Sequence, residues 1–473
     1  MKTQYRHTKI IFTLGPATES EEVLEELIRS GADICRLNMA HATNEWCEQM
    51  AERVKKVGER VGKDIALMMD VKGPEIRTSK IEGVWELMVG EKLDIMMRGN
   101  GESKGGVRSI SVNYPEMTEA VKEGDVILVD SGLVHLKVLE KKPDYIRTEV
   151  VIGGKLGSKR HINLPGIRVN LPALTEQDKE HIKIGAKNGM AFFALSFVRE
   201  AKDIEELKQY LKDCNSNARV IAKIEDQCGL KNLDAIIEAS DGVMVARGDL
   251  GVECPFEQIP IIQKMTVEKC ILYGKPVIVA THLLESMTYA PVPTRAEVSD
   301  VAQAIYEQTD AVMLSGETSV GKYPVQCVET IKKVVAHVES IIPAKHNEGP
   351  LILSGKNKML RSAVVLAQEI GNTGIMVFTR RGESIQKLSS LRPTRCPLYV
   401  FTDDHLLSVQ LRLLWGVEPF YIKFFKDRNQ TIEEAVKLLK ERQYVIENDY
   451  LIVLTNILVS RKSIDTIQLR KVE

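Results

Sequence analysis

The feature that most constrains this chain is an alternation of eight short apolar runs with longer amphipathic segments. The short runs are rich in β-branched residues, and the longer segments place apolar residues at helical spacing. This alternation predicts βα units around a parallel sheet. The eight expected strands are residues 10–14, 32–38, 64–70, 191–197, 219–225, 242–247, 276–282 and 311–317.

Eight strands separated by helices favour an α/β fold with a closed (β/α)8 TIM barrel, whose active site lies where the C-terminal ends of the strands meet. A doubly wound open sheet is the alternative, and it requires no closure at eight strands. In the first unit, the spacing predicts a capping box from Thr18 to Glu21, a helix from Glu21 to Arg29 and a stop at Gly31.

The helical spacing disappears between residues 78 and 167, where β-branched runs and Gly-Asp turns replace it. We expect this part to be a small β-barrel domain, inserted after the third strand and placed as a lid that excludes water. The segment 343–350 is the best linker candidate, and another α/β pattern follows it. The expected domains are residues 1–77 and 168–343 for the barrel, 78–167 for the lid, and 344–473 for a C-terminal α/β domain.

Charge and cysteine content exclude several classes of protein. The 64 Lys plus Arg and 65 Asp plus Glu give a formal net charge of −1, so no overall basic field attracts nucleic acid or a membrane surface, and any anion site must be local. No run approaches the roughly 18 apolar residues of a membrane helix. The eight cysteines form no C-x-x-C pair, which argues against a disulfide framework or a thiolate zinc site and favours a cytoplasmic location.

Polar residues recur at the ends of the expected strands, often two positions apart. Side chains two positions apart on a strand share a face, so these residues form a ring of cations and carboxylates at the barrel mouth. They are Arg36, Asn38, Asp70, Lys72, Lys223, Glu225, Arg247, Asp249, Thr281, Ser315 and Glu317.

This ring contains the groups that phosphoryl transfer needs. Glu225 and Asp249 come from adjacent strands and supply hard oxygen ligands suited to Mg2+. Lys223 lies two residues from Glu225, so it is expected to point toward the anion that the metal ion binds. Phosphoryl transfer requires such cations because its transition state spreads negative charge over oxygens. The backbone N–H groups from Gly248 onward suit a carboxylate. A single Lys-x-Glu pair is more often a solvated ion pair, so the joint pattern carries the argument.

Several strings closely resemble the pyruvate kinase family. They are I-F-T-L-G-P-A-T at 11–18, C-R-L-N at 35–38, K-G-P-E-I-R-T at 72–78, A-K-I-E at 222–225, M-V-A-R-G-D-L-G-V-E at 244–253, L-E-S-M at 284–287, P-T-R-A-E at 293–297 and L-S-G-E-T at 314–318. The resemblance is strong over both barrel segments, looser in the insertion, where N-L-P-G stands at 163–166, and weakest after residue 345.

The resemblance implies a phosphotransferase that converts phosphoenolpyruvate and ADP to pyruvate and ATP, the last step of glycolysis. It implies that Arg36 and Lys223 hold the phosphoryl group, with Lys223 as the main transition-state stabiliser. It implies that Glu225 and Asp249 bind Mg2+ or Mn2+, and that the Gly248–Asp249 backbone and Thr281 cradle the substrate carboxylate. Ser315 and Glu317 then belong to the network that delivers a proton to the enolate.

The resemblance also implies sites for K+ and for the nucleotide. Asn38, Asp70 and the carbonyl of Val71 resemble the K+ ligands, and the residues expected to face ADP are Pro16, Asn38, His41, Arg77 and Lys159. Ala40 stands where the family has a hydroxyl ligand for K+, which weakens the expected site. Glu75, in contrast, matches the form associated with K+ dependence.

For the C-terminal part, assembly and regulation are inferred from the family resemblance alone. The family resemblance implies a homotetramer, and the segment Thr379, Arg380, Arg381, Gly382 and Ser384 resembles a pocket for an effector phosphate. A capped helix with two solvated arginines is the alternative for this segment, because Glu383 repels an anion. Two alternatives stay open for the whole chain: a Mg2+-dependent keto-acid lyase or aldolase, and a catalytically weakened sensor homologue.

Overall fold

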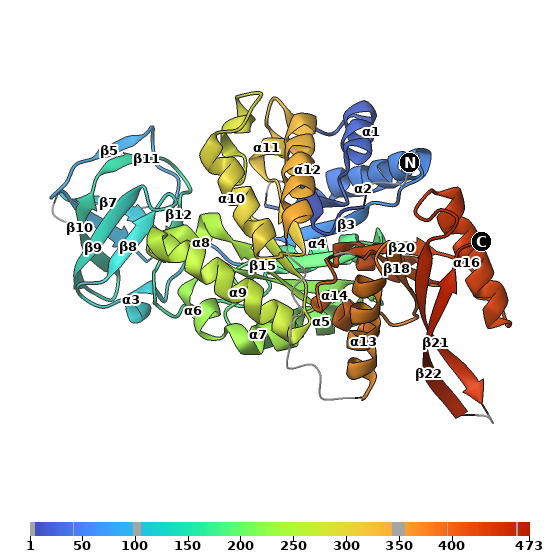
Figure 1. Cartoon of the computed structure of the whole chain (residues 1–473). Helices are drawn as coiled ribbons and strands as arrows, with labels where there is room; N and C mark the ends of the chain where they lie inside the picture. Colours follow the sequence, from blue (N-terminus) through green and yellow to red (C-terminus); the bar gives the residue numbers. More distant parts are fainter. Residues whose placement is uncertain (1–4, 41, 98–105, 343–354, 395, 460–461) are drawn as a thin grey trace.

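The computed structural model describes residues 5–40, 42–97, 106–342, 355–394, 396–459 and 462–473. Eight parallel strands form a closed barrel at its centre (Figure 1). In spatial order they are β1 (Lys9–Thr13), β17 (Ala311–Met313), β16 (Val277–Ala280), β15 (Gly242–Ala246), β14 (Arg219–Ile224), β13 (Phe192–Leu195), β3 (Ala66–Val71) and β2 (Ile34–Asn38). Each strand lies within or overlaps one expected run, so the TIM barrel is confirmed and the open sheet is excluded.

Helices surround the barrel and bury its outer face. The main ones are α1 (Glu21–Ser30), α2 (Asn44–Val61), α4 (Glu176–Lys187), α5 (Ala201–Asp213), α7 (Leu233–Ala239), α9 (Ile259–Tyr273), α10 (Arg295–Tyr306) and α12 (Pro324–Ile341). Gly31 ends α1 with φ 121°, as expected, but Ser20 caps its start by accepting a hydrogen bond from the backbone N–H of Val23. The expected capping box was wrong, because the Thr18 hydroxyl is buried and bonds to Gly15.

The inserted segment forms its own β domain with its own apolar core. Its seven-stranded sheet runs in the order β4 (Ile76–Arg77), β12 (His161–Asn163), β8 (Val126–Val129), β9 (Val134–Lys141), β10 (Tyr145–Ile152), β6 (Lys92–Met96) and β7 (Arg108–Ser111). A bridge between Thr78 and Val112 joins the two edges, so the sheet curls into a nearly closed barrel. β5 (Trp85–Leu87) and β11 (Gly154–Leu156) pair beside it, and the short α3 spans Met117–Ala120.

The C-terminal part has the expected α/β fold. Its five-stranded sheet has the order β20 (Val417–Tyr421), β19 (Leu398–Thr402), β18 (Thr373–Phe378), β21 (Tyr450–Val459) and β22 (Lys462–Lys471), with β22 antiparallel. Its helices are α13 (Gly355–Ile370), α14 (Glu383–Ser390), α15 (His405–Gln410) and α16 (Arg428–Glu441). The predicted linker, 343–350, lies outside the described residues, and the exact domain boundaries stay predictions.

The two added domains lie at opposite ends of the barrel (Figure 1). The C-terminal domain covers the N-terminal ends of the strands, where Val409 and Leu413 join the apolar cluster of the barrel interior. The inserted domain follows the C-terminal end of β3. It therefore lies at the same end of the barrel as the mouth. Across the described residues, no helix is both long and apolar enough to cross a membrane.

Candidate active site

A buried carboxylate joins two cations at the mouth of the barrel. Asp70, at the end of β3, accepts a hydrogen bond from Arg36 Nε at 2.7 Å and another from Lys223 Nζ at 3.1 Å. Arg36 also donates to Thr13 Oγ1 at 3.0 Å, and Lys223 donates to Ser196 Oγ at 2.7 Å. Burial opposes ionisation of Asp70, but the two cations outweigh it and keep its pKa below the ordinary value. Arg36 and Lys223 are therefore fixed in direction by one shared anion.

Lys223 and Glu225 form a buried ion pair rather than a solvated one. Their Nζ and Oε1 atoms are 2.9 Å apart, and the side chains are 10% and 1% exposed. Burial disfavours the charged amine, yet Asp70 and Glu225 outweigh it and raise the pKa of Lys223 above its ordinary value. Lys223 thus stays a cation at neutral pH.

Glu225 and Asp249 place two carboxylates near this cation. Glu225 Oε2 accepts a hydrogen bond from the backbone N–H of Phe197 at 2.7 Å. Burial nevertheless raises the pKa of Glu225 to about 7, and the charge of Asp249 contributes. Within the described chain, the Asp249 carboxylate makes no hydrogen bond or ion pair. Two hard-oxygen donors with incompletely balanced charge fit a divalent cation such as Mg2+.

A short helix, and not the expected strand end, carries Gly248 and Asp249. β15 ends at Ala246, and α8 (Arg247–Glu253) begins at once. The backbone N–H of Gly248 donates to Thr281 Oγ1 at 2.7 Å. Thr281 has φ 67° and the next residue, His282, has φ 55°, a backbone region that costs energy for residues other than glycine.

Arg247 holds this strained turn in place. Its guanidinium donates to the Thr281 carbonyl at 2.7 Å and to Asp300 Oδ1 at 2.7 Å, while the residue is only 9% exposed. The Gly248 N–H and the Thr281 hydroxyl are consequently kept side by side at the mouth.

Glu317 is buried completely and binds backbone groups. Its Oε1 accepts from the Leu284 N–H at 3.1 Å, and its Oε2 accepts from the Ser315 N–H at 2.7 Å. β17 ends at Met313, two residues earlier than Ser315, and α11 (Gly316–Ser319) follows. The Ser315 hydroxyl is buried without a hydrogen-bond partner among the described residues. Glu317 therefore fixes the turn that carries Ser315.

The residues expected to bind K+ lie on adjacent strands. Asn38 pairs with Asp70 in the register of β2 and β3, and its Oδ1 accepts from the backbone N–H of Ala40 at 3.2 Å. The carbonyl of Val71 accepts from the Ser196 N–H at 3.2 Å. Each of these oxygens keeps a further lone pair for a cation.

Two of the residues expected to face ADP come from the inserted domain, and they meet there. Arg77 donates to Glu75 Oε2 at 2.7 Å and to the carbonyl of Lys159 at 2.8 Å. Lys72 also pairs with Glu75 at 2.9 Å. Pro16 is exposed in the loop after β1, whereas His41 lies outside the described residues. Lys159 is exposed, whereas Arg77 and Lys72 are half-buried and share Glu75.

The comparisons with known proteins agree with one another. The family model described as "Pyruvate kinase, barrel domain" matches residues 5–328, and "Pyruvate kinase, alpha/beta domain" matches residues 357–469. The chain belongs to the pyruvate kinase family. It is thereby placed among phosphotransferases.

Three curated relatives illustrate the similarity. A pyruvate kinase of Sporosarcina psychrophila is 40% identical over 96% of this chain and 78% of its own length. "Pyruvate kinase isozyme G, chloroplastic" of Nicotiana tabacum is 38% identical over 99% of this chain and 84% of its own length. The Geobacillus stearothermophilus pyruvate kinase is 39% identical over 95% and 77%.

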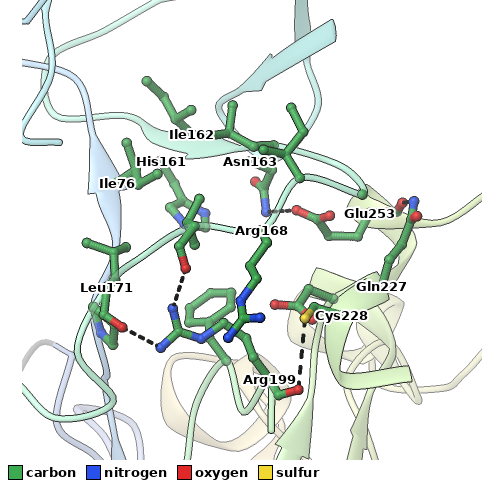
Figure 2. Close-up of a pocket in the computed structure, with 17 residues that line it drawn as sticks. Ile76, His161, Ile162, Asn163, Arg168, Leu171, Arg199, Gln227, Cys228 and Glu253 are labelled. Atoms are coloured by element: carbon green, nitrogen blue, oxygen red, sulfur yellow. Dashed lines mark hydrogen bonds between the residues drawn. The ribbon is translucent and has the colours of Figure 1, made fainter. Parts of the chain in front are cut away.

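Sequence reasoning missed a polar contact between the inserted domain and the barrel. Asn163 Nδ2 in β12 donates to Glu253 Oε1 at 3.0 Å, and Gln227 Nε2 donates to the Glu253 carbonyl at 2.6 Å. Asn163, Gln227 and Glu253 line a small pocket of about 60 Å3. Figure 2 shows this pocket, which Arg168 and Arg199 also line. Burial raises the pKa of Glu253 to about 7. Asn163 and Glu253 stand in motifs of this family, but sequence spacing gives no sign that they meet.

The segment expected to bind an effector phosphate makes its own internal contacts. Thr379 Oγ1 accepts from the backbone N–H groups of Arg381 and Gly382 at 3.3 and 2.9 Å. Arg380 forms a bidentate pair with Asp403, with a shortest distance of 2.7 Å. Ser384 lies in the first turn of α14. Gly382 begins α14 without a side-chain cap, so the capped-helix alternative is not confirmed. Arg380 and Arg381 are both exposed, and only Arg380 has an ion pair among the described residues.

Proposed function

We propose that this chain transfers the phosphoryl group of phosphoenolpyruvate to ADP, giving pyruvate and ATP. The observation that carries the proposal is the shared contact of Arg36 and Lys223 with the buried Asp70, beside Glu225 and Asp249, at the mouth of a barrel of this family. Cations fixed in this way match a transition state that spreads negative charge over phosphoryl oxygens.

Glu225 and Asp249 would hold the divalent cation, Mg2+ or Mn2+. When bound, this ion neutralises charge on the phosphoryl and enolate oxygens. Lys223 and Arg36 would bind the phosphoryl group together with this ion. Because Asp70 fixes both side chains before the substrate arrives, little reorganisation is needed during the reaction.

The remaining site residues would orient the substrate and the proton. The Gly248–Asp249 backbone and the Thr281 hydroxyl would hold the carboxylate of phosphoenolpyruvate. An oxygen of the ADP β-phosphate attacks phosphorus, the bond from phosphorus to the enol oxygen breaks, and the enolate takes a proton at carbon. Ser315 would belong to the network that supplies the proton, with Glu317 positioning it.

The proposal includes K+ at Asn38, Asp70 and the Val71 carbonyl, and ADP beside Pro16, Asn38, His41, Arg77 and Lys159. It also includes a homotetramer, allosteric control by a phosphate at the Thr379–Ser384 segment, and a cytoplasmic location. All eight cysteines are free thiols, which supports a reducing compartment.

The decisive experiment measures pyruvate formation from phosphoenolpyruvate with Mg2+, with and without ADP, and with K+ or a large inert cation. We expect product only with ADP and faster turnover with K+. Pyruvate formation that does not require ADP would favour the lyase or aldolase alternative. Absence of product under all conditions would favour the sensor alternative.

A further inference from the structure

A second charged cavity lies at the opposite face of the barrel from the active site. It encloses about 480 Å3 between the N-terminal ends of β1 to β3, the helix α12 and the C-terminal domain. This volume is in the range of small-molecule sites. We call it the cationic pocket, because seven of its sixteen lining residues are Lys or Arg and only two are acidic.

The two acidic residues are already in use. Asp33 forms ion pairs with Arg6 and with Lys63, the second at 3.1 Å, while Glu418 is 3.9 Å from Arg412. Burial opposes ionisation of Asp33, but the surrounding cations hold its pKa well below the ordinary value. A single carboxylate thus serves several cations, and the pocket keeps a surplus of positive charge.

Several cations of the pocket are only partly compensated, although Arg29 pairs with Glu25 and Lys9 Nζ donates to the Val417 carbonyl at 2.7 Å. Burial lowers the pKa of Lys9 and of Lys63, and the charge of Arg6 contributes to both shifts. The Nε atoms of Arg6 and Arg412 are buried without a hydrogen-bond partner in the described parts of the chain. Lys332, on α12, is half-buried and makes no hydrogen bond or ion pair within those same ranges.

We propose that the cationic pocket binds a small phosphate-bearing anion with two or more negative charges. Such a ligand supplies the acceptors that the buried guanidinium donors lack, and it offsets the repulsion among clustered cations. Phosphate suits the pocket better than a simple carboxylate because Arg presents a planar fork of donors to its oxygens. The ligand bridges barrel and C-terminal domain, since Lys63 and Lys332 belong to the first and Arg412 to the second.

Lys332 allows a clean test, because its substitution breaks no hydrogen bond or ion pair within the described residues. Lys333 is the next residue on the same helix and is exposed, so Lys333→Gln is a control with the same change in charge. The probe is inorganic pyrophosphate, titrated by calorimetry against the full chain without divalent metal. All variants carry Lys223→Ala, which weakens binding at the active site.

We expect pyrophosphate to bind the Lys223→Ala protein and its Lys333→Gln derivative equally. We expect roughly tenfold weaker binding to the Lys332→Gln derivative, because one charge-assisted hydrogen bond is lost. The Arg412→Gln derivative should show a loss of similar size. Equal binding to the Lys332→Gln and Lys333→Gln derivatives, or no binding to any of these proteins, would overturn the proposal. Succinate binding as tightly as pyrophosphate would overturn its phosphate preference.

Discussion

The two ends of the barrel both bury charged side chains, but the buried charges nearest the strand ends are paired to different extents. At the N-terminal end, Arg392 donates to both oxygens of Asp310, directly before β17, at 2.7 and 3.2 Å. Asp310 also accepts from the backbone N–H groups of Val277 and Trp415. Both side chains of the pair are at most 2% exposed. This pair joins the C-terminal domain to the barrel, and of the Arg392 nitrogens only Nε has no hydrogen-bond partner among the described residues.

The mouth distributes its charges differently. Lys223 is shared between Asp70 and Glu225, while Asp249 has no ion pair among the described residues and the pKa of Glu225 is raised to about 7. A buried group that is not fully paired lowers stability, so its retention points to a ligand that completes it. The nearly complete pairing of Arg392 with Asp310 marks the structural end of the barrel, and incomplete pairing marks the site. At the rim of the structural end, the cationic pocket is incomplete in the same sense.

The largest expected effect is at the mouth. Lys223→Ala removes a fixed charge directed at the transition state and should lower kcat by roughly 10³-fold or more. Steady-state kinetics with saturating phosphoenolpyruvate and ADP would measure this. Lys179→Ala, which removes a lysine of the exposed Lys179–Glu176 pair, is the control and should leave kcat unchanged. Near wild-type turnover in Lys223→Ala would show that the role given to Lys223 is wrong.

The next effect is at the opposite end and concerns stability. Arg392→Met leaves Asp310 buried without its cation and should lower the free energy of unfolding by about 3–5 kcal/mol. Urea denaturation would measure the change, and kcat at low temperature should stay near that of the wild type. Arg60→Met, in an exposed network with Glu21 and Glu25, should cost about 1 kcal/mol or less. A large fall in kcat with intact folding would contradict the separation of the two ends.

Glu253 offers a smaller test that depends on pH. Its pKa is raised from 4.5 to about 7, so between these values the folded state binds more protons than the unfolded state, and stability falls as pH rises. Glu253→Gln removes this titration. Relative to wild type, its free energy of unfolding should be higher at pH 8 than at pH 5 by about 1–3 kcal/mol. Urea denaturation at both pH values measures the difference.

A matched control for this titration is the exposed Glu257, four residues further along the chain. Glu257→Gln should show no comparable pH-dependent difference from wild type. If Glu253→Gln and Glu257→Gln show the same dependence on pH, burial does not raise the pKa of the Glu253 carboxylate in the folded state.

The barrel could be predicted from sequence because strands covered on both faces must be continuously apolar, and that pattern repeats eight times. The strand ends were less certain. The runs 242–247 and 311–317 end at Ala246 and Met313. A short helix without a capping side chain starts directly after Ala246, and another starts at Gly316 after two intervening residues. Such helix starts leave no signal in the spacing of apolar residues.

For the candidate site, the sequence predicted which residues take part but not the contacts between them. The resemblance named Asp70 for K+ and Lys223 for the phosphoryl group, and the structure adds a direct bond between them at 3.1 Å. These residues are 153 positions apart, so no local pattern contains their contact. The contact of Asn163 with Glu253 depends in the same way on how the inserted domain packs against the barrel.

The smallest expected effect tests whether the K+ site at the barrel mouth lacks an oxygen ligand at residue 40. Ala40 follows Asn38 by two residues, and its N–H already binds Asn38 Oδ1 at 3.2 Å, so a hydroxyl on residue 40 would lie close to the expected K+ ligands. Ala40→Ser should lower the K+ concentration for half-maximal activity by roughly five- to tenfold, as one added oxygen ligand contributes about 1 kcal/mol. Titration of activity with K+, at ionic strength held constant by a large inert cation, measures this shift. Ala40→Gly adds no oxygen and is the control. An equal response of Ala40→Ser and Ala40→Gly would mean that residue 40 does not face the cation, and that Asn38, Asp70 and the Val71 carbonyl complete the site without it.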